Sequence, residues 1–487
     1  MKSISTSALW SEATMPIFER FHRVRGFGLP LMLASGLAAA GCGNPTTKNV
    51  SSVTTPSTPP ALVYFAPAMN SGTLSTFAFD NSANTFVRTT YSVTGATITD
   101  AGDIEPSSNG IVGLEPTFLA GVDGTITQPA PAPQGWAVEI PGQAALVEMA
   151  VPGVTLANGQ IPPLNYFTPA VPSSTCPSFT SPQSFLFVTL PKPLAGASAT
   201  SISEQTWNPE LETAYGSVQV STKGTSVQLA SISQNLFPGF SGGSNAPGNP
   251  APSNTSASCS PSYYGQVISM PGTVTVTSPG GNETATPTAT IAIGASGMLV
   301  EDAGSSTVQG EPYYNILGAG FGSIGLPKPS SDPTLAVIGA TYQGFVTAPG
   351  SNTGFNLISS FGPASSSQST CTAFVSELSG ANLSPSANTV YGGEYPLNGA
   401  ASSPLGTANC DIAVDLGSPG SVANGMYTAA TVYIGTSFPG NGINAPYSFP
   451  AVAVAGQIDG KSAIFLLGVD TTGSPSRAWG IYLLESD

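Results

Sequence analysis

Over most of its length the chain alternates between short apolar runs and clusters of Gly, Pro, Asn and Ser. Short runs separated by turn-forming residues are typical of β-strands joined by turns. Residues 216–222 show this most clearly, because Val218 and Val220 fall on one face and the polar residues between them fall on the other. A half-buried strand has this period of two. The polar turn at 222–225 then returns the chain, so 216–232 is predicted to be a β-hairpin.

The same pattern predicts further strands along the chain. They are 61–68, 73–80, 85–93, 136–140, 145–151, 184–190, 264–270, 273–279, 289–302, 334–348, 355–361, 371–378, 410–416, 426–435, 451–458, 462–470 and 477–486. Two stretches, 203–214 and 373–383, have a helical pattern, and the second overlaps a predicted strand. The 56 Gly and 45 Pro residues disfavour long helices. We therefore expect an all-β fold of antiparallel sandwich or barrel-like domains with few or no helices.

Two stretches without apolar periodicity divide the chain. Residues 42–60 are rich in Ser, Thr and Pro, a composition typical of a tether. Residues 237–261 are rich in Gly, Ser and Pro and predict a linker or a long loop. A linker is favoured, because a structureless loop of that length is uncommon inside a compact domain. The expected domains are therefore an N-terminal β domain at 61–236 and a C-terminal β domain at 262–487.

The N-terminal segment has the pattern of an export signal. Three arginines lie within 20–25, an uncharged and mostly apolar run covers 27–40, and small residues precede Cys42. The apolar run is too short to cross ~30 Å of hydrocarbon as a helix. Met15 would start a signal of ordinary length, whereas Met1 adds a long polar lead, and both starts remain open.

The end of this signal, within 15–42, resembles the lipobox of bacterial lipoproteins. The resemblance implies that 1–41 is a signal peptide and that Cys42 is lipidated and becomes the mature N-terminus. The sequence departs from the family pattern at Ala39, where Leu is favoured. Plain secretion after cleavage at small residues is the alternative. By resemblance to sorting rules in some bacteria, Gly43 favours the outer membrane, on the cell surface or on the periplasmic face.

The charge balance limits the partners that the protein can have. Without 1–41 the chain carries 7 basic and 24 acidic residues, a net charge of −17. Such a chain is repelled by nucleic acid and by an anionic membrane surface, so contact with a membrane is expected only through the lipid anchor. Only 8% of the residues are charged, so solubility depends on uncharged polar side chains.

Four cysteines besides Cys42 remain, and an even number in an exported chain predicts two disulfides. Four cysteines allow three connectivities. Nearest-neighbour pairing, Cys176 with Cys259 and Cys371 with Cys410, is the one that we prefer. Metal binding is disfavoured, because the sequence has no CxxC spacing and the mature chain has no histidine.

The missing histidine also excludes several reactions. His22 lies inside the signal, so Ser-His-Asp triads and His-based metal sites are excluded from the mature chain. Residues 239–243 fit GxSxG, but Ser241 then lacks its usual base and lies in a Gly/Ser-rich stretch, which predicts a loop. Residues 320–325 fit GxGxxG, but the prolines that follow forbid the helix that a dinucleotide site needs, so a turn is expected.

These exclusions leave acid–base catalysis by Asp and Glu side chains open. Seven acids lie in or beside apolar runs: Glu139, Glu148, Glu301, Asp302, Glu394, Asp411 and Asp415. Two of them across a cleft would serve as general acid and base on a glycosidic bond, with Trp136, Trp207 or Trp479 stacking on sugar rings. Solvent-facing strand positions that happen to be acidic are the simpler interpretation.

Two acidic segments, 100–105 and 122–125, are weak candidates for a calcium site. Ordinary acidic turns are favoured at both, so no metal, cofactor or catalytic residue is assigned. The leading hypothesis is a lipid-anchored envelope protein with a binding or structural role and a carbohydrate or an envelope protein as partner. A carboxylate-dependent glycoside hydrolase or carbohydrate-binding protein is the alternative. Two acids converging in an open, aromatic-lined cleft would favour the hydrolase.

Overall fold

The computed structural model describes a defined set of segments of the chain. They are residues 62–67, 74–91, 97–106, 110–120, 126–127, 135–150, 165–172, 176–190, 214–236, 255–262, 265–271, 274–278, 281–285, 288–294, 297–302, 322–347, 356–363, 369–395, 408–418, 423–438, 443–472 and 477–486. The predicted signal peptide, Cys42, the tether, most of the 203–214 helix and most of the 237–261 linker lie outside these residues.

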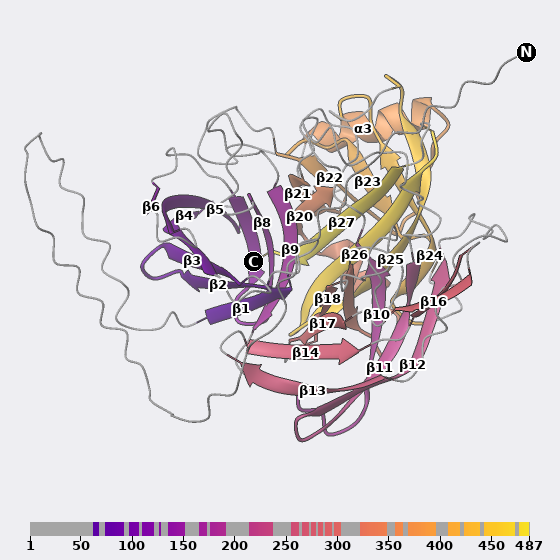
Figure 1. Cartoon of the computed structure of the whole chain (residues 1–487). Coiled ribbons are helices and arrows are strands. Elements are labelled where there is room, and N and C mark those ends of the chain that lie inside the picture. The colour runs from indigo at the N-terminus through magenta and orange to yellow at the C-terminus, as the bar shows by residue number, and fades with distance from the viewer. Residues whose placement is uncertain are drawn as a thin grey trace, which may run out of the picture. The chain divides into compact units, whose positions relative to one another are not determined.

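The first β unit, here called the N-terminal sheet, has nine antiparallel strands (Figure 1). They are β1 Leu62–Pro67, β2 Leu74–Asp80, β3 Thr85–Tyr91, β4 Thr97–Pro106, β5 Ile111–Ala120, β6 Ile126–Thr127, β7 Gly135–Ile140, β8 Ala144–Ala150 and β9 Asn165–Pro172. Their order is β4-β3-β2-β1-β9-β8-β7-β5-β6, and β4 also pairs with β5. The sheet therefore curls back on itself.

The second unit, the central barrel, is a closed antiparallel barrel. Its strands are β10 Gln183–Thr189, β11 Ala214–Lys223, β12 Ser226–Leu236, β13 Thr255–Ser262, β14 Gly265–Pro271, β17 Thr288–Ile293, β18 Leu299–Asp302 and β19 Gly322–Pro327. A separate two-stranded sheet, β15 Val274–Ser278 with β16 Gly281–Ala285, is inserted after β14. The predicted hairpin at 216–232 is confirmed, since β11 pairs with β12 across the turn.

The third unit, the C-terminal barrel, is also closed. It comprises β20 Tyr342–Thr347, β21 Asn356–Gly362, β22 Thr389–Glu394, β23 Ile412–Asp415, β24 Met426–Ile434, β25 Tyr447–Ile458, β26 Lys461–Asp470 and β27 Arg477–Glu485. Two helices accompany it, α2 Thr334–Gly339 before β20 and α3 Ser369–Gly380 between β21 and β22. In both barrels neighbouring strands follow one another in chain order, so the connections form an up-and-down meander.

The all-β prediction is confirmed, because strands dominate the described residues and only two helices occur among them. Of the linker or long loop predicted at 237–261, the structure describes residues 255–261, which belong to β13 and pair with β12 in the central barrel. The chain passes from one β unit to the next between β9 and β10 and between β19 and β20.

Both predicted disulfides are present. Cys176 is bonded to Cys259 of β13, and Cys371 of α3 is bonded to Cys410 just before β23. These are the nearest-neighbour pairs. The first bond lies at the central barrel and the second ties the helix to the wall of the C-terminal barrel.

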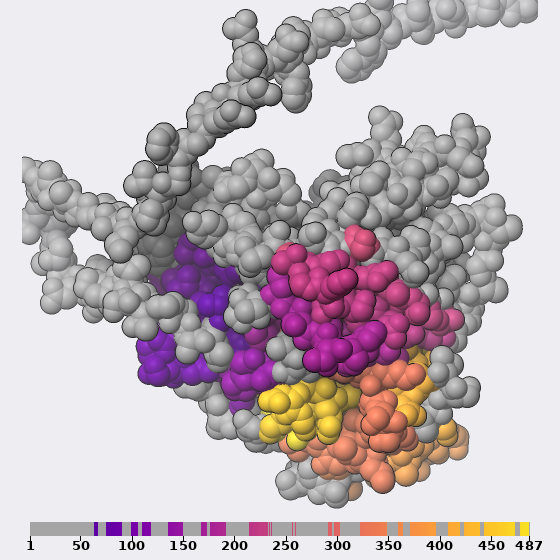
Figure 2. All heavy atoms as spheres, turned by 90° about the horizontal axis from the view of Figure 1, so that it is seen from below, coloured from indigo at the N-terminus to yellow at the C-terminus, as the bar shows by residue number. Residues whose placement is uncertain are grey.

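Two kinds of core explain why many strands are apolar at every position. One face of β26 contributes Ile464 and Leu466 to a cluster formed only by residues of the C-terminal barrel and α2. Its other face contributes Phe465 and Leu467 to a cluster that joins all three β units. A strand that is buried on both faces reads as a continuous apolar run. Figure 2 shows residues of the three units meeting on one face.

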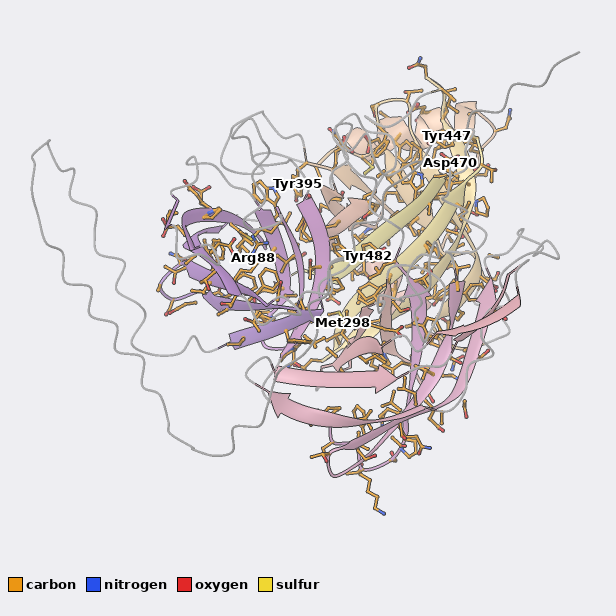
Figure 3. The ribbon with its side chains drawn as sticks, in the orientation of Figure 1. Arg88, Met298, Tyr395, Tyr447, Asp470 and Tyr482 are labelled. Carbon is orange, nitrogen blue, oxygen red and sulfur yellow. A yellow bond between two sulfur atoms is a disulfide. The ribbon has the colours of Figure 1, made fainter. Side chains whose placement is uncertain are left out.

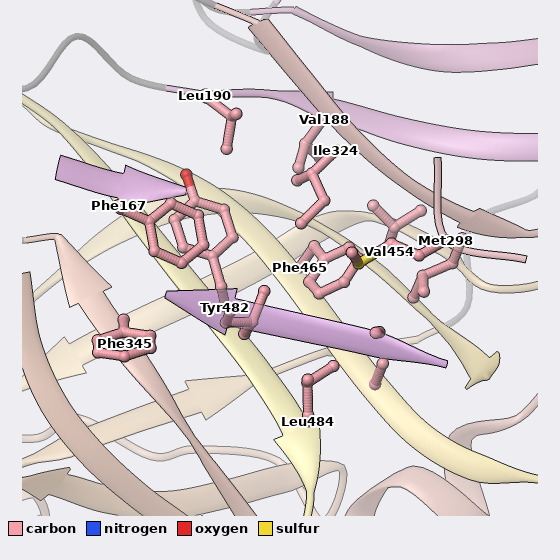
Figure 4. Close-up of a cluster of buried hydrophobic side chains, with 14 of the residues drawn as sticks. Phe167, Val188, Leu190, Met298, Ile324, Phe345, Val454, Phe465, Tyr482 and Leu484 are labelled. Atoms are coloured by element: carbon pink, nitrogen blue, oxygen red, sulfur yellow. The ribbon is translucent and has the colours of Figure 1, made fainter. Parts of the chain in front are cut away.

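The shared cluster contains a ring stack between distant parts of the chain. Phe167 of β9 lies against Tyr482 of β27, with ring centroids 4.3 Å apart and planes inclined by 13° (Figure 4). The ring of Phe345 on β20 also packs here, with its centroid 5.8 Å from that of Phe167. Burying a large apolar side chain stabilises a fold by about 1.5–3 kcal/mol. The N-terminal sheet and the C-terminal barrel are therefore held together by a packed aromatic core.

The strand predicted at 334–348 is partly wrong, because its first part is helix α2 and only the second part is strand β20. The reason lies just before the helix. Oδ1 of Asp332 accepts hydrogen bonds from the backbone N and the Oγ1 of Thr334, at 3.1 and 2.7 Å. Pro333 supplies a fixed φ at the helix start. These are start signals for a helix that outweigh the apolar run.

The strand predicted at 371–378 is wrong as well, because these residues lie in α3. Cys371, Phe374 and Leu378 recur at helical spacing and are all buried against the barrel. The competing helix prediction at 373–383 is the better one. The predicted turn at 320–325 is also corrected, since Gly322–Pro327 is strand β19, which closes the central barrel against β10.

Candidate functional site

The structure separates the seven candidate acids and brings two of them together. Glu139 lies on β7, Glu148 on β8, Glu301 and Asp302 on β18, and Asp415 at the end of β23. Glu148 and Glu301 are buried. Glu394, at the end of β22, and Asp411, directly before β23, are the pair that converges.

Glu139 is engaged by two neighbours in the N-terminal sheet. Tyr64 donates its hydroxyl hydrogen to Oε2 of Glu139 at 3.0 Å, and Asn81 donates to Oε1 at 2.6 Å. The Tyr64 hydroxyl also accepts from the backbone N of Gly142 at 2.8 Å. Burial, together with the nearby Glu139 charge, raises the pKa of Tyr64 far above its usual range. These contacts fix the β7–β8 turn, which is a structural role.

Asp415 stabilises the segment before β22. It accepts hydrogen bonds from the backbone N of Ser386 at 2.6 Å, from the Ser386 hydroxyl at 2.5 Å and from the backbone N of Gly417 at 2.8 Å. Its carboxylate is therefore taken up by local turns and does not point toward a substrate.

The calcium candidate at 100–105 lies in strand β4, so the turn expected there is wrong. Asp100 forms a buried ion pair with Arg88 of β3, with Nη2 2.6 Å from Oδ2, and Figure 3 shows Arg88 within the N-terminal sheet. Asp100 lies opposite Arg88 in the register between β3 and β4 and opposite the apolar Leu119 on β5, so Arg88 is its partner inside the sheet. Among the described residues no group of three potential metal-binding side chains occurs. The second candidate, 122–125, lies outside them.

The converging pair lies between β22 and the start of β23. Asn409 donates its side-chain amide to Oε1 of Glu394 at 2.8 Å. The backbone N of Asn409 donates to the carbonyl O of Glu394 at 2.8 Å and that of Asp411 donates to the carbonyl O of Gly392 at 3.0 Å, so the two acids lie on directly paired segments and Glu394 acts on Asp411. As ionised groups neither can donate to the other, and among the described residues no donor reaches Oδ1 or Oδ2 of Asp411 or Oε2 of Glu394. These three carboxyl oxygens are therefore buried without a hydrogen-bond donor among the described residues.

Glycine at position 393 makes room for this pair. Oδ1 of Asp411 lies where a Cβ on residue 393 would be, so a larger residue would collide with the carboxyl. Burial, then the charge and hydrogen bond of Glu394, and lastly the charge of Glu377 on α3, raise the pKa of Asp411 to about 9. Asp411 therefore holds a proton at neutral pH.

The pair is closed to solvent. Asp411 is 0% exposed and Glu394 is 4% exposed. A glycoside hydrolase needs its two carboxyl groups to flank a bound sugar, and this pair offers no path for one. The candidate sugar-binding tryptophans do not support a hydrolase either. Trp136 and Trp479 are buried, and Trp207 lies outside the described residues.

The two glycine motifs contribute no site. Ser241 of the GxSxG match lies outside the described residues. Ser323 and Ile324 of the GxGxxG match are buried in β19, where they pair with β10 and β18. No sequence signal had marked Glu394 and Asp411 as partners.

Neither α2 nor α3 is long and apolar enough to cross a membrane, and no other helix occurs among the described residues. Comparison with protein-family models gave no match, and comparison with curated proteins gave none either. The chemistry of the residues themselves therefore has to carry any functional assignment.

Proposed function

We propose that the chain is an exported, lipid-anchored protein of the cell envelope with a binding or structural role. The observation that carries this proposal is the order of features at the N-terminus: three arginines within 20–25, an apolar run, small residues before Cys42, and the tether at 42–60. The two disulfides support it, because such bonds persist in oxidising compartments outside the cytoplasm.

A non-enzymatic role is supported by the structural contacts that the candidate catalytic acids make. Asp100 is paired with a cation, Glu139 and Asp415 hold turns, and Glu394 and Asp411 are buried together. The interior of the C-terminal barrel is occupied by large side chains, among them Trp479, Tyr342 and Phe449. A filled interior favours a rigid body over a ligand-binding barrel.

The hydrolase or carbohydrate-binding alternative has weaker support. Sugar recognition relies on accessible aromatic rings. The exposed large hydrophobic residues of the described part are Leu335, Val375 and Ile443, none of which is aromatic. The net charge of −17 further favours a neutral or cationic envelope component over a polyanion as partner.

The anchor is tested by fractionating a bacterial host that expresses the full chain. The wild-type protein is expected in the membrane fraction, released by detergent and retained at high salt. Cys42→Ser is expected to accumulate as an unprocessed precursor, while Thr46→Ser, a matched change in the tether, behaves as the wild type does. A soluble and fully processed Cys42→Ser protein would contradict the proposal.

A further inference from the structure

Helix α3 is attached to the outer wall of the C-terminal barrel at one small region. Phe374 and Leu378 pack there against Ala413 and Tyr433. The disulfide Cys371–Cys410 joins the helix to the residue directly before Asp411. Figure 1 shows α3 beside β22 and β23. The buried carboxyl pair therefore lies at the covalent attachment point of the helix.

The charges that act on Asp411 among the described residues are those of two acids, Glu394 and Glu377. Glu377 of α3 accepts a hydrogen bond from the backbone N of Thr436 at 2.8 Å, and its charge also acts on Asp411. The sequence has no Lys, Arg or His between Lys328 and Lys461, a range that includes α3 and β20 to β24. Two ionised carboxylates buried together without a cation would strongly destabilise this part of the fold.

The other ionisable side chains packed around this wall do not change that balance. Tyr391 of β22 and Tyr433 of β24 are each influenced by Asp415, and burial raises the pKa of both. Tyr395, labelled in Figure 3, donates its hydroxyl hydrogen to Oε1 of Gln343 at 3.3 Å. Glu394 and Glu377 are thus the charged groups that act on Asp411.

We propose that Glu394 and Asp411 form a proton-dependent clasp, which holds α3 on the C-terminal barrel while the two carboxyl groups share one proton. At alkaline pH the carboxyl O–H bond breaks, the proton combines with hydroxide to give water, and two carboxylates are left facing each other. Their repulsion, added to that of Glu377, loosens the packing of α3 on β22 and β23.

The direction of the pH dependence follows from linkage. Because the pKa of Asp411 is raised by folding, the folded chain keeps a proton that the unfolded chain loses above about pH 4. The stabilisation is complete below that pH and declines as the pH rises through about 9. Within that window the opening equilibrium of α3 is expected to shift up to about tenfold per pH unit.

The experiment compares the full chain, purified in detergent, with Asp411→Asn and Glu394→Gln, in which an amide imitates the protonated group. Hydrogen exchange of peptides from 369–380 is measured at pH 5, 7 and 9 and corrected for intrinsic rates. The wild-type helix is expected to lose protection as the pH rises, whereas both variants keep it. Asp103→Asn, which removes an exposed acid of β4, is the matched control and should follow the wild type.

Three results would overturn the proposal. One is an equal loss of α3 protection with pH in the wild type and in both variants. Another is failure of both variants to fold at pH 5, where the amides should replace a protonated pair without penalty. The third is a calcium-dependent gain of α3 protection at pH 8 that Asp411→Asn abolishes, since a cation and not a proton would then neutralise the pair.

Discussion

Phe167 and Tyr482 stack face to face, although one belongs to the N-terminal sheet and the other to the last strand of the C-terminal barrel. This contact lies in the one hydrophobic cluster that all three β units share. Mutual burial of this kind couples the units, because separating them would return large apolar surfaces to water.

Phe167→Ala is therefore expected to destabilise the whole protein by about 3–5 kcal/mol through loss of burial and creation of a cavity. Urea unfolding followed by both tryptophan fluorescence and circular dichroism measures the effect. Leu335→Ala is the control, since that side chain is 84% exposed and its removal should change stability by less than about 0.5 kcal/mol. A loss below about 1 kcal/mol for Phe167→Ala would show that the stack does not couple the units.

Removal of one partner of the buried Arg88–Asp100 pair should be costly. Nε and Nη2 of Arg88 donate to the two carboxylate oxygens of Asp100, and both residues are buried. Arg88→Met leaves a buried carboxylate without its cation, which is expected to cost about 3–5 kcal/mol. The double variant Arg88→Met/Asp100→Leu should recover most of that loss. Urea unfolding of the four proteins in a double-mutant cycle checks this, and equal stability of single and double variants would contradict it.

The two disulfides should stabilise the barrels and leave the N-terminal sheet less affected. Residues 62–172 contain no cysteine. Closing the loop between Cys371 and Cys410, 39 residues apart, removes unfolded-state entropy worth about 4 kcal/mol in the chain-entropy model. Reduction is expected to increase hydrogen exchange in α3 and β23 more than in β1 and β2.

Peptide mapping without reduction tests the pairing directly. It should recover one peptide pair containing Cys176 and Cys259 and another containing Cys371 and Cys410. A free thiol at any of these positions, or exchanged partners, would be incompatible with the structure.

Asp332 should make α2 sensitive to acid. Burial raises the pKa of Asp332, but hydrogen bonds from Thr334 and Tyr427 outweigh it, and the net pKa is lowered. A lowered pKa means that the stabilisation is present above the ordinary value and is lost as the pH falls through the folded-state value. Asp332→Ala should cost about 1 kcal/mol at pH 7, by analogy with lost helix caps, and less at pH 2. Thermal unfolding of both proteins at the two pH values measures this difference, and a gap that is as large at pH 2 as at pH 7 would contradict it.

The fold class was predictable because alternation and turn residues are local signals, as in the hairpin formed by β11 and β12. Strands such as β4 and β13 were missed, because their sequences TITDAGDIEP and TSASCSPS are polar and gain their partners from neighbouring strands. The helical start at Asp332 was overlooked for the opposite reason, since the apolar residues that follow resemble a strand.

The buried carboxyl pair could not be predicted from spacing. Seventeen positions separate Glu394 from Asp411, and their approach depends on the register between β22 and β23 and on the absence of a side chain at Gly393. The pairing itself is a property of the folded barrel wall.

Closure of the two barrels also bears on association between copies of the protein. Within the described part of each barrel every strand has a hydrogen-bonded neighbour on both sides. Unpaired edge strands are the usual templates on which further chains add and aggregate. Only 8% of the residues are charged, but acidic residues outnumber basic ones by 26 to 11, so copies of the chain also repel one another. Among the described strands, the two closed barrels thus offer no free edge on which a second copy could add, and the net negative charge acts in the same direction.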